Sequence, residues 1–311
     1  MVEKERKLVK PETKFVQIAG RWRFEGTTAI YLGPDERNQP YGVSLAPTRF
    51  RSGSISALAT IKDPKVAARL VVGFNAGTGA YYSVGIGGYE YAYVIDEFTP
   101  GRGWRAVRAT GASSQIRTEK PQVLEVTVSG QRVSLSVDGV RVLEDTVPFP
   151  LQGDQVGLFA WGEQEVTFKD FTIRGDKPRV FVVMQFGEPY DFLYRDVILP
   201  VTRKLEFEAF RADDVFRPGI ILQDIIRGIV ECDVVIADIT PVNANVFYEL
   251  GYAHAMQKPT ILLANRSVEK LPFDISGYRV VYYSDTIRGK GDITSALEKH
   301  LESIRRGAGV V

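Results

Sequence analysis

The pattern of hydrophobic and polar residues changes its period near residue 175. Beyond that point, short continuous apolar runs alternate with stretches in which apolar side chains recur every three or four positions. The first pattern is typical of parallel strands covered on both faces, and the second of helices that pack on one side. The C-terminal part is therefore predicted to be α/β. The expected strands are 180–184, 206–211, 234–236, 260–263 and 279–283, and the expected helices are 190–205, 220–230, 246–256 and 293–304.

The alternation of strands and helices predicts a flavodoxin-like doubly wound parallel sheet with strand order 2-1-3-4-5. Within the first expected helix, Pro200 lacks a backbone N–H and is expected to kink or split the helix. The side chains of this helix that are expected to face the sheet are Phe192, Val197, Ile198 and Val201.

Before residue 175 the pattern is that of short strands joined by glycine-rich turns. Alternating apolar residues at 133–137 lead into Asp138-Gly139, a strong signal for a two-residue hairpin turn. In the stretch 165–173 the apolar phase shifts, which predicts a β-bulge near Lys169 and Asp170. Many strands without a confident helix predict a β-sandwich or jelly roll. We therefore expect a tail at 1–11, a sandwich domain at 12–175 and an α/β domain at 179–307.

Composition excludes several classes of protein. A net charge of +1 favours neither nucleic acid nor acidic lipid as a partner. The single cysteine, Cys232, excludes an intrachain disulfide framework, and its place before a buried strand favours an inert core thiol. No apolar run approaches the roughly 20 residues that a membrane-spanning helix needs, and residues 1–10 do not resemble a signal peptide. The expected location is cytoplasmic.

Polar residues gather where the predicted parallel strands end, and this edge of an open α/β sheet is where ligands bind. A helix N-terminus there presents free N–H groups to an anion, and Arg211 is expected to add a phosphate contact. The candidate ligand-binding residues are Gln185, Phe186 and Gly187 after the first strand, Arg211 and Asp213 after the second, and Asp238, Thr240, Asn243, Asn245 and Tyr248 after the third.

Glu249 is the candidate catalytic residue. It shares a helix face with apolar Val246, Ala253 and Met256, and no basic residue lies near it in sequence. A partly buried carboxylate of this kind has a perturbed pKa, and such groups cluster at functional sites. The structural alternative is an acid placed early in a helix, where the macrodipole favours it.

The other polar residues at this edge have structural alternatives too. Asn243 and Asn245 are both good helix N-caps. Asp238 at the end of a strand is either a ligand-binding residue or a turn-former, and Thr240 is equally open.

The sequence lacks the residue patterns that a catalytic triad, a metal site or a phosphate-binding loop requires. The chain has only two histidines, His254 and His300, so no Ser-His-Asp or Cys-His arrangement is indicated. No His, Cys and carboxylate spacing predicts a metal site, and no phosphate-binding Gly-x4-Gly-Lys-Ser/Thr loop is present. We expect no metal and no cofactor.

The motifs of the C-terminal part resemble a known family. They are Val-Val-Met-Gln-Phe-Gly-Glu-Pro-Tyr at 182–190, Phe-Arg-Ala-Asp-Asp at 210–214, Ile-Ala-Asp-Ile-Thr-Pro-Val-Asn-Ala-Asn-Val-Phe-Tyr-Glu-Leu-Gly-Tyr-Ala-His-Ala at 236–255, and Leu-Pro-Phe-Asp-Ile-Ser-Gly-Tyr at 271–278. Together they resemble the nucleoside 2-deoxyribosyltransferase-like domains, which are relatives of the TIR domain.

This resemblance implies that Glu249 attacks or stabilises the anomeric carbon of a ribosyl group. The transferases keep an acid six residues before this glutamate, and here that position is Asn243, which cannot act as a general acid. Hydrolysis, most simply of NAD as substrate, is therefore expected ahead of transfer. These families usually assemble, which implies a homo-oligomer, and TIR-type domains commonly serve as effectors of bacterial antiphage defence.

The closing strands of the N-terminal part resemble concanavalin-like (laminin-G-like) sandwiches, through Val-Ser-Leu-Ser-Val-Asp-Gly-Val at 133–140, Gln-Val-Gly-Leu-Phe-Ala-Trp at 155–161 and Phe-Lys-Asp-Phe-Thr-Ile at 168–173. The resemblance implies a sensor or assembly domain with a glycan or protein ligand. Aromatic residues that are candidates for stacking on sugars, or else simply fill the sheet, are Tyr81, Tyr82, Tyr89, Tyr91, Tyr93 and Trp104.

Three functions stay open on the sequence. The first is a nucleotide N-glycosidase, with Asp238 and Arg211 positioning ribose and phosphate. The second is a non-catalytic nucleotide sensor or a deoxyribosyltransferase, and the third is a glycan- or protein-binding protein.

Overall fold

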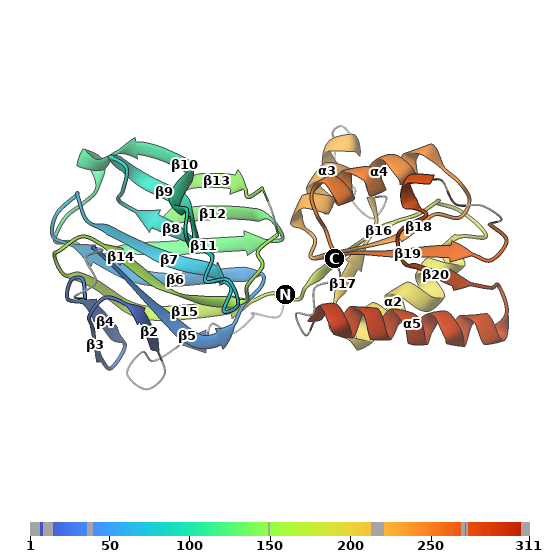
Figure 1. Ribbon diagram of the computed structural model, residues 1–311, viewed down its shortest axis with the longest axis horizontal. Coiled ribbons are helices and arrows are strands. Elements are labelled where there is room, and N and C mark those ends of the chain that lie inside the picture. The colour runs from blue at the N-terminus through green and yellow to red at the C-terminus, as the bar shows by residue number, and fades with distance from the viewer. Residues whose placement is uncertain are drawn as a thin grey trace. The chain divides into compact units, whose positions relative to one another are not determined.

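The computed structural model describes residues 7–8, 15–35, 40–148, 150–212, 221–268, 271 and 273–305. The chain forms two compact units, Met1–Asp176 and Lys177–Val311 (Figure 1).

The first unit is a sandwich of two antiparallel sheets (Figure 1). Among the described residues, one sheet has the order β13-β12-β11-β6-β15-β4-β3, with β1 also paired to β15, and the other has the order β10-β9-β8-β7-β14-β5-β2. Their strands are β1 Lys7–Leu8, β2 Val16–Ala19, β3 Trp22–Glu25, β4 Thr28–Tyr31, β5 Tyr41–Arg49, β6 Gly53–Ile61, β7 Ala67–Phe74, β8 Tyr81–Ile86, β9 Tyr91–Thr99, β10 Gly103–Ala112, β11 Gln122–Ser129, β12 Arg132–Val137, β13 Val140–Thr146, β14 Gln155–Trp161 and β15 Val166–Gly175.

Two local predictions for this unit are confirmed. Asp138 and Gly139 join β12 to β13 with φ values of 50° and 81°, as a two-residue hairpin requires. The pairing of β15 with β6 shifts register between Lys169 and Thr172, which is the predicted bulge.

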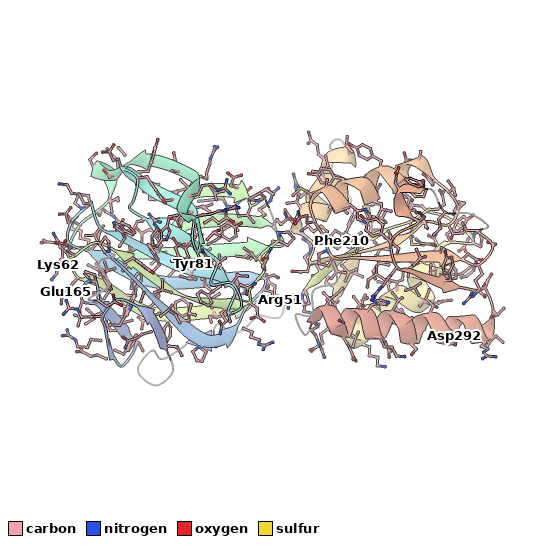
Figure 2. All side chains as sticks on the ribbon, in the orientation of Figure 1. Arg51, Lys62, Tyr81, Glu165, Phe210 and Asp292 are labelled. Carbon is pink, nitrogen blue, oxygen red and sulfur yellow. The ribbon has the colours of Figure 1, made fainter. Side chains whose placement is uncertain are left out.

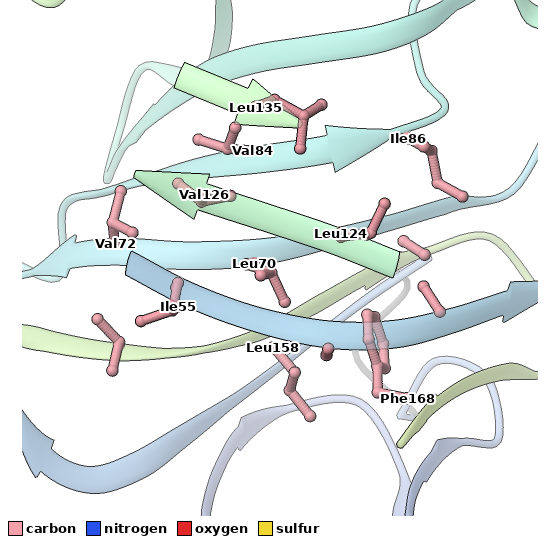
Figure 3. Close-up of a cluster of buried hydrophobic side chains, with 14 of the residues drawn as sticks. Ile55, Leu70, Val72, Val84, Ile86, Leu124, Val126, Leu135, Leu158 and Phe168 are labelled. Atoms are coloured by element: carbon pink, nitrogen blue, oxygen red, sulfur yellow. The ribbon is translucent and has the colours of Figure 1, made fainter. Parts of the chain in front are cut away.

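The main core of the sandwich lies between its two sheets. Side chains that alternate along each strand point into it, including Leu70 and Val72 of β7, Val84 of β8 and Val126 of β11 (Figure 3). The seven-stranded sheet differs from an ordinary half-buried sheet, because every residue of β7 and β8 is buried, on both faces. A second apolar cluster, with Val43, Leu45, Ala67, Val71, Phe74, Tyr81 and Phe159 at its centre, covers the outer face of this sheet.

The second unit is a five-stranded parallel sheet with the order β17-β16-β18-β19-β20, so the predicted order 2-1-3-4-5 is confirmed. Helices α3 and α4 cover one face and α2 and α5 the other (Figure 1). The elements are β16 Arg179–Val183, α1 Asp191–Leu193, a π-helical turn Tyr194–Ile198, α2 Leu199–Lys204, β17 Glu208–Phe210, α3 Ile221–Glu231, β18 Val234–Asp238, α4 Ala244–Ala255, β19 Thr260–Asn265, a 3-10 turn Phe273–Ile275, β20 Val280–Tyr283 and α5 Ile287–Arg305. Another short 3-10 turn, Ser113–Gln115, lies in the first unit between β10 and β11.

The first expected helix differs from its prediction in two ways. A π-helical turn interrupts it before Pro200, which lies in the first turn of α2 where a missing N–H is tolerated. Val197, Ile198 and Val201 are buried as expected, but Phe192 is 54% exposed, so its inward assignment was wrong. At about 100° per residue, Phe192 lies on the side of the helix opposite Val197, Ile198 and Val201, so even an unbroken helix would turn it away from their apolar stripe.

Two further boundaries were misplaced. The second strand begins at Glu208, two residues later than expected, because Phe207 donates its N–H to the Thr202 carbonyl in a turn that closes α2. Helix α5 begins at Ile287, six residues early, since the Thr286 hydroxyl accepts the Gly289 N–H and caps it. Within the described part of the chain, no helix is both long and apolar enough to cross a membrane.

Candidate functional site

The candidate residues lie at one edge of the parallel sheet. Gln185, Phe186 and Gly187 follow β16, and Arg211 follows β17. Thr240 and Asn243 lie between β18 and α4, and Asn245 lies in the first turn of α4. Because β16, β17 and β18 are parallel, the segments that follow them leave from the same edge. The remaining candidate, Asp213, lies outside the described residues.

Asn243 links two of these segments. It is the N-cap of α4, with extended backbone angles, and its side-chain oxygen accepts the Asn245 N–H at 2.8 Å. Its side-chain amide donates to Oε1 of Gln185, beyond the end of β16. Both functional groups of Asn243 are therefore engaged, and Asn245 contributes a backbone N–H to the cap while its residue is exposed.

Arg211 is also engaged with protein groups. Its guanidinium is 2.6 Å from the Asp191 carboxylate and lies over the rings of Tyr194 and Phe186, at 4.3 and 5.1 Å from their centroids. The hydrogen bond from Arg211 holds the pKa of Asp191 below its usual value. A phosphate at this position would share Arg211 with Asp191. Asp191 was missed by sequence reasoning, because nothing local to it signals a partner twenty residues away.

Asp238 is fully buried at the end of β18. Its carboxylate accepts the Tyr283 hydroxyl at 2.8 Å and the Thr240 N–H at 3.1 Å. The second bond is the turn-forming contact that the sequence left open. Burial raises the pKa of Asp238 to about 7, although both hydrogen bonds oppose that shift. Thr240 in turn accepts the Asn265 N–H at 2.8 Å, which ties this loop to the end of β19.

The Tyr283 hydroxyl is the second group that sequence reasoning missed, and it carries a testable consequence. Removing it in Tyr283→Phe takes a donor from a buried carboxylate, so the folded-state pKa of Asp238 rises further. We expect the free energy of unfolding to fall by about 1–2 kcal/mol near pH 8, where Asp238 is ionised, and by less near pH 5, where it is protonated.

Denaturant unfolding at the two pH values measures this difference. Tyr282→Phe is the matched control, because Tyr282 is the neighbouring tyrosine and is 39% exposed. Equal losses at both pH values, or equal losses in the two variants, would show that the hydroxyl does not stabilise the ionised carboxylate.

Glu249 lies on α4 between exposed Tyr248 and buried Leu250. Its side chain is half-buried, and burial raises its pKa to about 7. Among the described residues it has no hydrogen-bond or ion-pair partner, in contrast to Asp238 and Asp191. A carboxylate that is partly desolvated, near its midpoint at neutral pH and not committed to a neighbour is available to act as a base, as a nucleophile or as a stabiliser of positive charge.

Exposed aromatic rings accompany this carboxylate. Tyr248 is 57% exposed beside it in the sequence, and Phe186, which follows β16, is 44% exposed. The described residues contain no cluster of three or more potential metal ligands. Glu249 and Tyr248 share α4, and Phe186 follows β16 at the same edge of the sheet, so this edge offers a carboxylate and exposed rings of the kind that suit a flat base.

Several solved structures resemble the sandwich at low identity. A carbohydrate-binding module CBM66 from Bacillus subtilis has 17% identity and a TM-score of 0.42, covering 53% of this chain and 98% of that one. A galectin-like protein of unknown function from the same species has 13% identity and a TM-score of 0.40, covering 54% and 93%. A β-glucanase from Bacillus licheniformis has 8% identity and a TM-score of 0.39, covering 54% and 97%.

No curated protein matches the chain. The α/β unit does have a counterpart among protein families, and the matched segment contains Arg211, Asp238, Asn243 and Glu249. The family in question is the nucleoside 2-deoxyribosyltransferase family, whose model matches residues 188–281 of this chain.

Proposed function

We propose that the α/β domain hydrolyses the bond between the ribosyl group and the base of a nucleotide, with NAD as the substrate and Glu249 as the catalytic carboxylate. The observation that carries the proposal is Glu249, a half-buried carboxylate with a pKa near 7 and no partner among the described residues, within the segment that matches the transferase family. The carboxylates of half-buried Asp191 and buried Asp238 at this edge are already engaged by protein donors.

Asn243 supports hydrolysis of a cationic substrate. Departure of a neutral base normally needs a proton from a general acid, and the resembling transferases have an acid where this chain has Asn243. Both functional groups of Asn243 are engaged in the cap of α4 and with Gln185, and neither is acidic. The nicotinamide of NAD is a pyridinium cation that leaves as a neutral molecule without protonation, so no acid is required at position 243.

The proposed reaction balances without a cofactor. The bond between ribosyl C1′ and the nicotinamide nitrogen breaks, and its electron pair stays with the nitrogen. The Glu249 carboxylate stabilises the oxocarbenium-like centre or forms an ester with C1′. Water then adds at C1′, its proton is lost to solvent or to Glu249, and ADP-ribose and nicotinamide are the products.

The remaining residues are proposed to bind the substrate or to position the loops that do. Tyr248 and Phe186 present exposed rings for stacking, and Gln185 and the Gly187 backbone lie in the segment that follows β16. Buried Arg211, held by Asp191, and fully buried Asp238, held by Tyr283, are proposed to act through their neighbours, by positioning the loops at this edge rather than by contacting the substrate. Such an NAD-consuming activity would suit an effector of antiphage defence that acts as a homo-oligomer, with the sandwich as its sensor or assembly domain.

Base release measured by chromatography tests the proposal. The substrates are NAD, nicotinamide mononucleotide and nicotinamide riboside, which have cationic bases, and adenosine, deoxyadenosine and AMP, which have neutral ones. We expect release from the cationic set and slower or undetectable release from the neutral set. Faster release from neutral nucleosides would contradict the role given to Asn243. Transfer of deoxyribose to an added free base would instead show a transferase, and binding of NAD without release would show a sensor.

A further inference from the structure

The turn that joins β8 to β9 has an unusual backbone. Gly87, Gly88, Tyr89 and Glu90 all have positive φ, of 78°, 121°, 53° and 66°, and the last two are not glycines. Left-handed backbone at a residue with a side chain costs free energy, so it persists only where surrounding contacts fix it. Residues held in this way concentrate at ligand-binding positions, which makes this turn a candidate segment of a site.

A buried ion pair fixes the turn. Arg69, 3% exposed, pairs with Asp96, 1% exposed, and Ser83 also donates to Asp96. Arg69 donates to the Gly87 carbonyl at 2.9 Å, and the Tyr89 hydroxyl donates to Asp96 at 3.3 Å. Because the Asp96 carboxylate neutralises the Arg69 guanidinium, the pair holds the turn in place without giving it a net charge.

The turn borders an open depression of about 440 Å³, which is lined by Tyr89, Glu90, Tyr91, Gly111 and Ala112. Tyr89 and Tyr91 are 45% and 46% exposed, whereas Tyr81 and Tyr82 of the adjoining strand are buried (Tyr81 in Figure 2). The predicted role of Tyr81 and Tyr82 as stacking residues was therefore wrong, because their rings fill the sheet. Tyr89 and Tyr91 do present part of their surface to solvent.

The charges around this depression favour a cation. Glu90 is its one charged lining residue, and within the described part of the chain this exposed carboxylate forms no ion pair and no side-chain hydrogen bond. The Tyr89 ring already lies against a cation, since the Arg69 guanidinium is 5.8 Å from its centroid. The hydroxyl of Tyr89 donates to the Asp96 carboxylate, which adds electron density to the ring and strengthens its attraction for a cation.

We propose that this depression binds a quaternary ammonium group, such as that of choline, with its methyl groups against Tyr89 and Tyr91 and its charge near Glu90. A quaternary ammonium ion combines a positive charge with an apolar surface, and aromatic rings recognise it through cation–π attraction. The fixed turn holds Tyr89 and Glu90 in place before the ligand arrives, so little ordering accompanies binding. A phosphorylated or acidic ligand is disfavoured by the Glu90 carboxylate.

Titration of the full-length chain with choline chloride and with tetramethylammonium chloride tests this proposal. Saturation-transfer NMR detects the bound cation through its equivalent methyl protons. We expect saturable binding in the millimolar range, weakened about tenfold or more in Glu90→Gln and in Tyr91→Ala. The neutral analogue of choline, in which a tert-butyl group replaces the trimethylammonium group, should also bind about tenfold more weakly or worse. Added sodium chloride should reduce the affinity for both cations.

Two variants serve as controls. Glu119→Gln removes another exposed acid of the same unit, at a φ of 60°, and should leave binding unchanged. Tyr91→Phe keeps the ring and should retain affinity, and thermal unfolding shows whether each variant stays folded. Vesicles of phosphatidylcholine identify the source of the group. Sedimentation of the protein with the vesicles, reversed by choline, indicates a lipid headgroup, and binding of choline without sedimentation indicates a free small molecule.

Absence of saturable binding of both cations would overturn the proposal. Binding that Glu90→Gln and Tyr91→Ala leave intact would do the same, as would equal affinity for choline and its neutral analogue. The titration is repeated with Glu249→Gln, because Glu249 and exposed Tyr248 also offer a carboxylate and a ring. Loss of binding in that variant alone would place the cation in the other unit and overturn the proposal. Base release is not measured in this assay, so the two outcomes are separate.

Discussion

Replacing Glu249 with Gln is expected to reduce base release from NAD by roughly a thousandfold or more, with little change in nucleotide affinity. The amide keeps the size of the side chain but can neither attack C1′ nor neutralise a developing positive charge. Glu249 has no hydrogen-bond or ion-pair partner among the described residues, so the substitution breaks no such interaction there. Initial rates give the loss of activity, and calorimetric titration with a slowly cleaved analogue gives the affinity.

The pH dependence adds an independent check on the same residue. The reaction needs the ionised carboxylate, and burial raises its pKa to about 7, so kcat/KM of the wild type should rise with pH through that value. Because the folded-state pKa is raised, the group's contribution to stability is present below its unfolded value and is lost as pH rises through about 7. Glu249→Gln lacks this loss and should be more stable than wild type near pH 8, by about 1–2 kcal/mol after solvent screening.

Glu302→Gln, on α5, serves as the matched control for charge removal and should keep wild-type activity. Base release that persists in Glu249→Gln would remove this carboxylate from the mechanism. A kcat/KM that stays flat between about pH 5 and 8 would show that its ionisation does not limit the reaction.

The largest effect on stability is expected at the Arg69–Asp96 pair. Asp96→Ala leaves a guanidinium that is 3% exposed without its carboxylate and frees the Ser83 and Tyr89 hydroxyls as well. Breaking a buried pair from one side is predicted to lower the free energy of unfolding by about 3–5 kcal/mol. Denaturant unfolding of the full chain, followed through tryptophan fluorescence, measures it, since all three tryptophans lie in the sandwich.

Two comparisons separate burial from charge. Lys62 and Glu165 form a pair of 2.7 Å with side chains 58% and 42% exposed (Figure 2), and Glu165→Ala should lose no more than about 1 kcal/mol. Replacing Arg69 and Asp96 together with Met and Leu should lose less than Asp96→Ala alone, because no unpaired charge remains. An Asp96→Ala loss similar to that of Glu165→Ala would mean that water reaches Arg69.

The parts of the fold that were predicted correctly depend on local signals. The strand order of the α/β unit follows from alternating elements and the handedness of crossovers, and the hairpin at Asp138 follows from a dipeptide with positive φ. The sequence left Asn243 and Asn245 both open as N-caps of α4, and the structure places the cap at Asn243, whose side chain accepts the N–H two residues further on. The predicted start of α5 was misplaced, because Thr286 caps the helix ahead of two glycines, and glycines in a sequence argue against a helix.

The parts that were missed depend on contacts between distant residues. Tyr283 meets Asp238 across β19, forty-five residues away in sequence, and no local pattern marks either partner. The apolar layer on the outer face of the seven-stranded sheet arises from six strands together, so no single stretch of sequence marks it. The tyrosines of β8 and β9 could not be divided into buried and exposed ones until the turn between them was placed.

The reactivity of Cys232 is expected to report local opening of the α/β unit. It is the single cysteine, it is fully buried, its thiol donates to the Ile229 carbonyl, and burial raises its pKa to about 11. A thiol reagent should therefore modify the protein only when the layer of α3 lifts from the sheet. The rate of that modification, measured with and without nucleotide, reports local opening of the α/β unit without any engineered label. Position 89 or 91 stays available for a second, introduced cysteine.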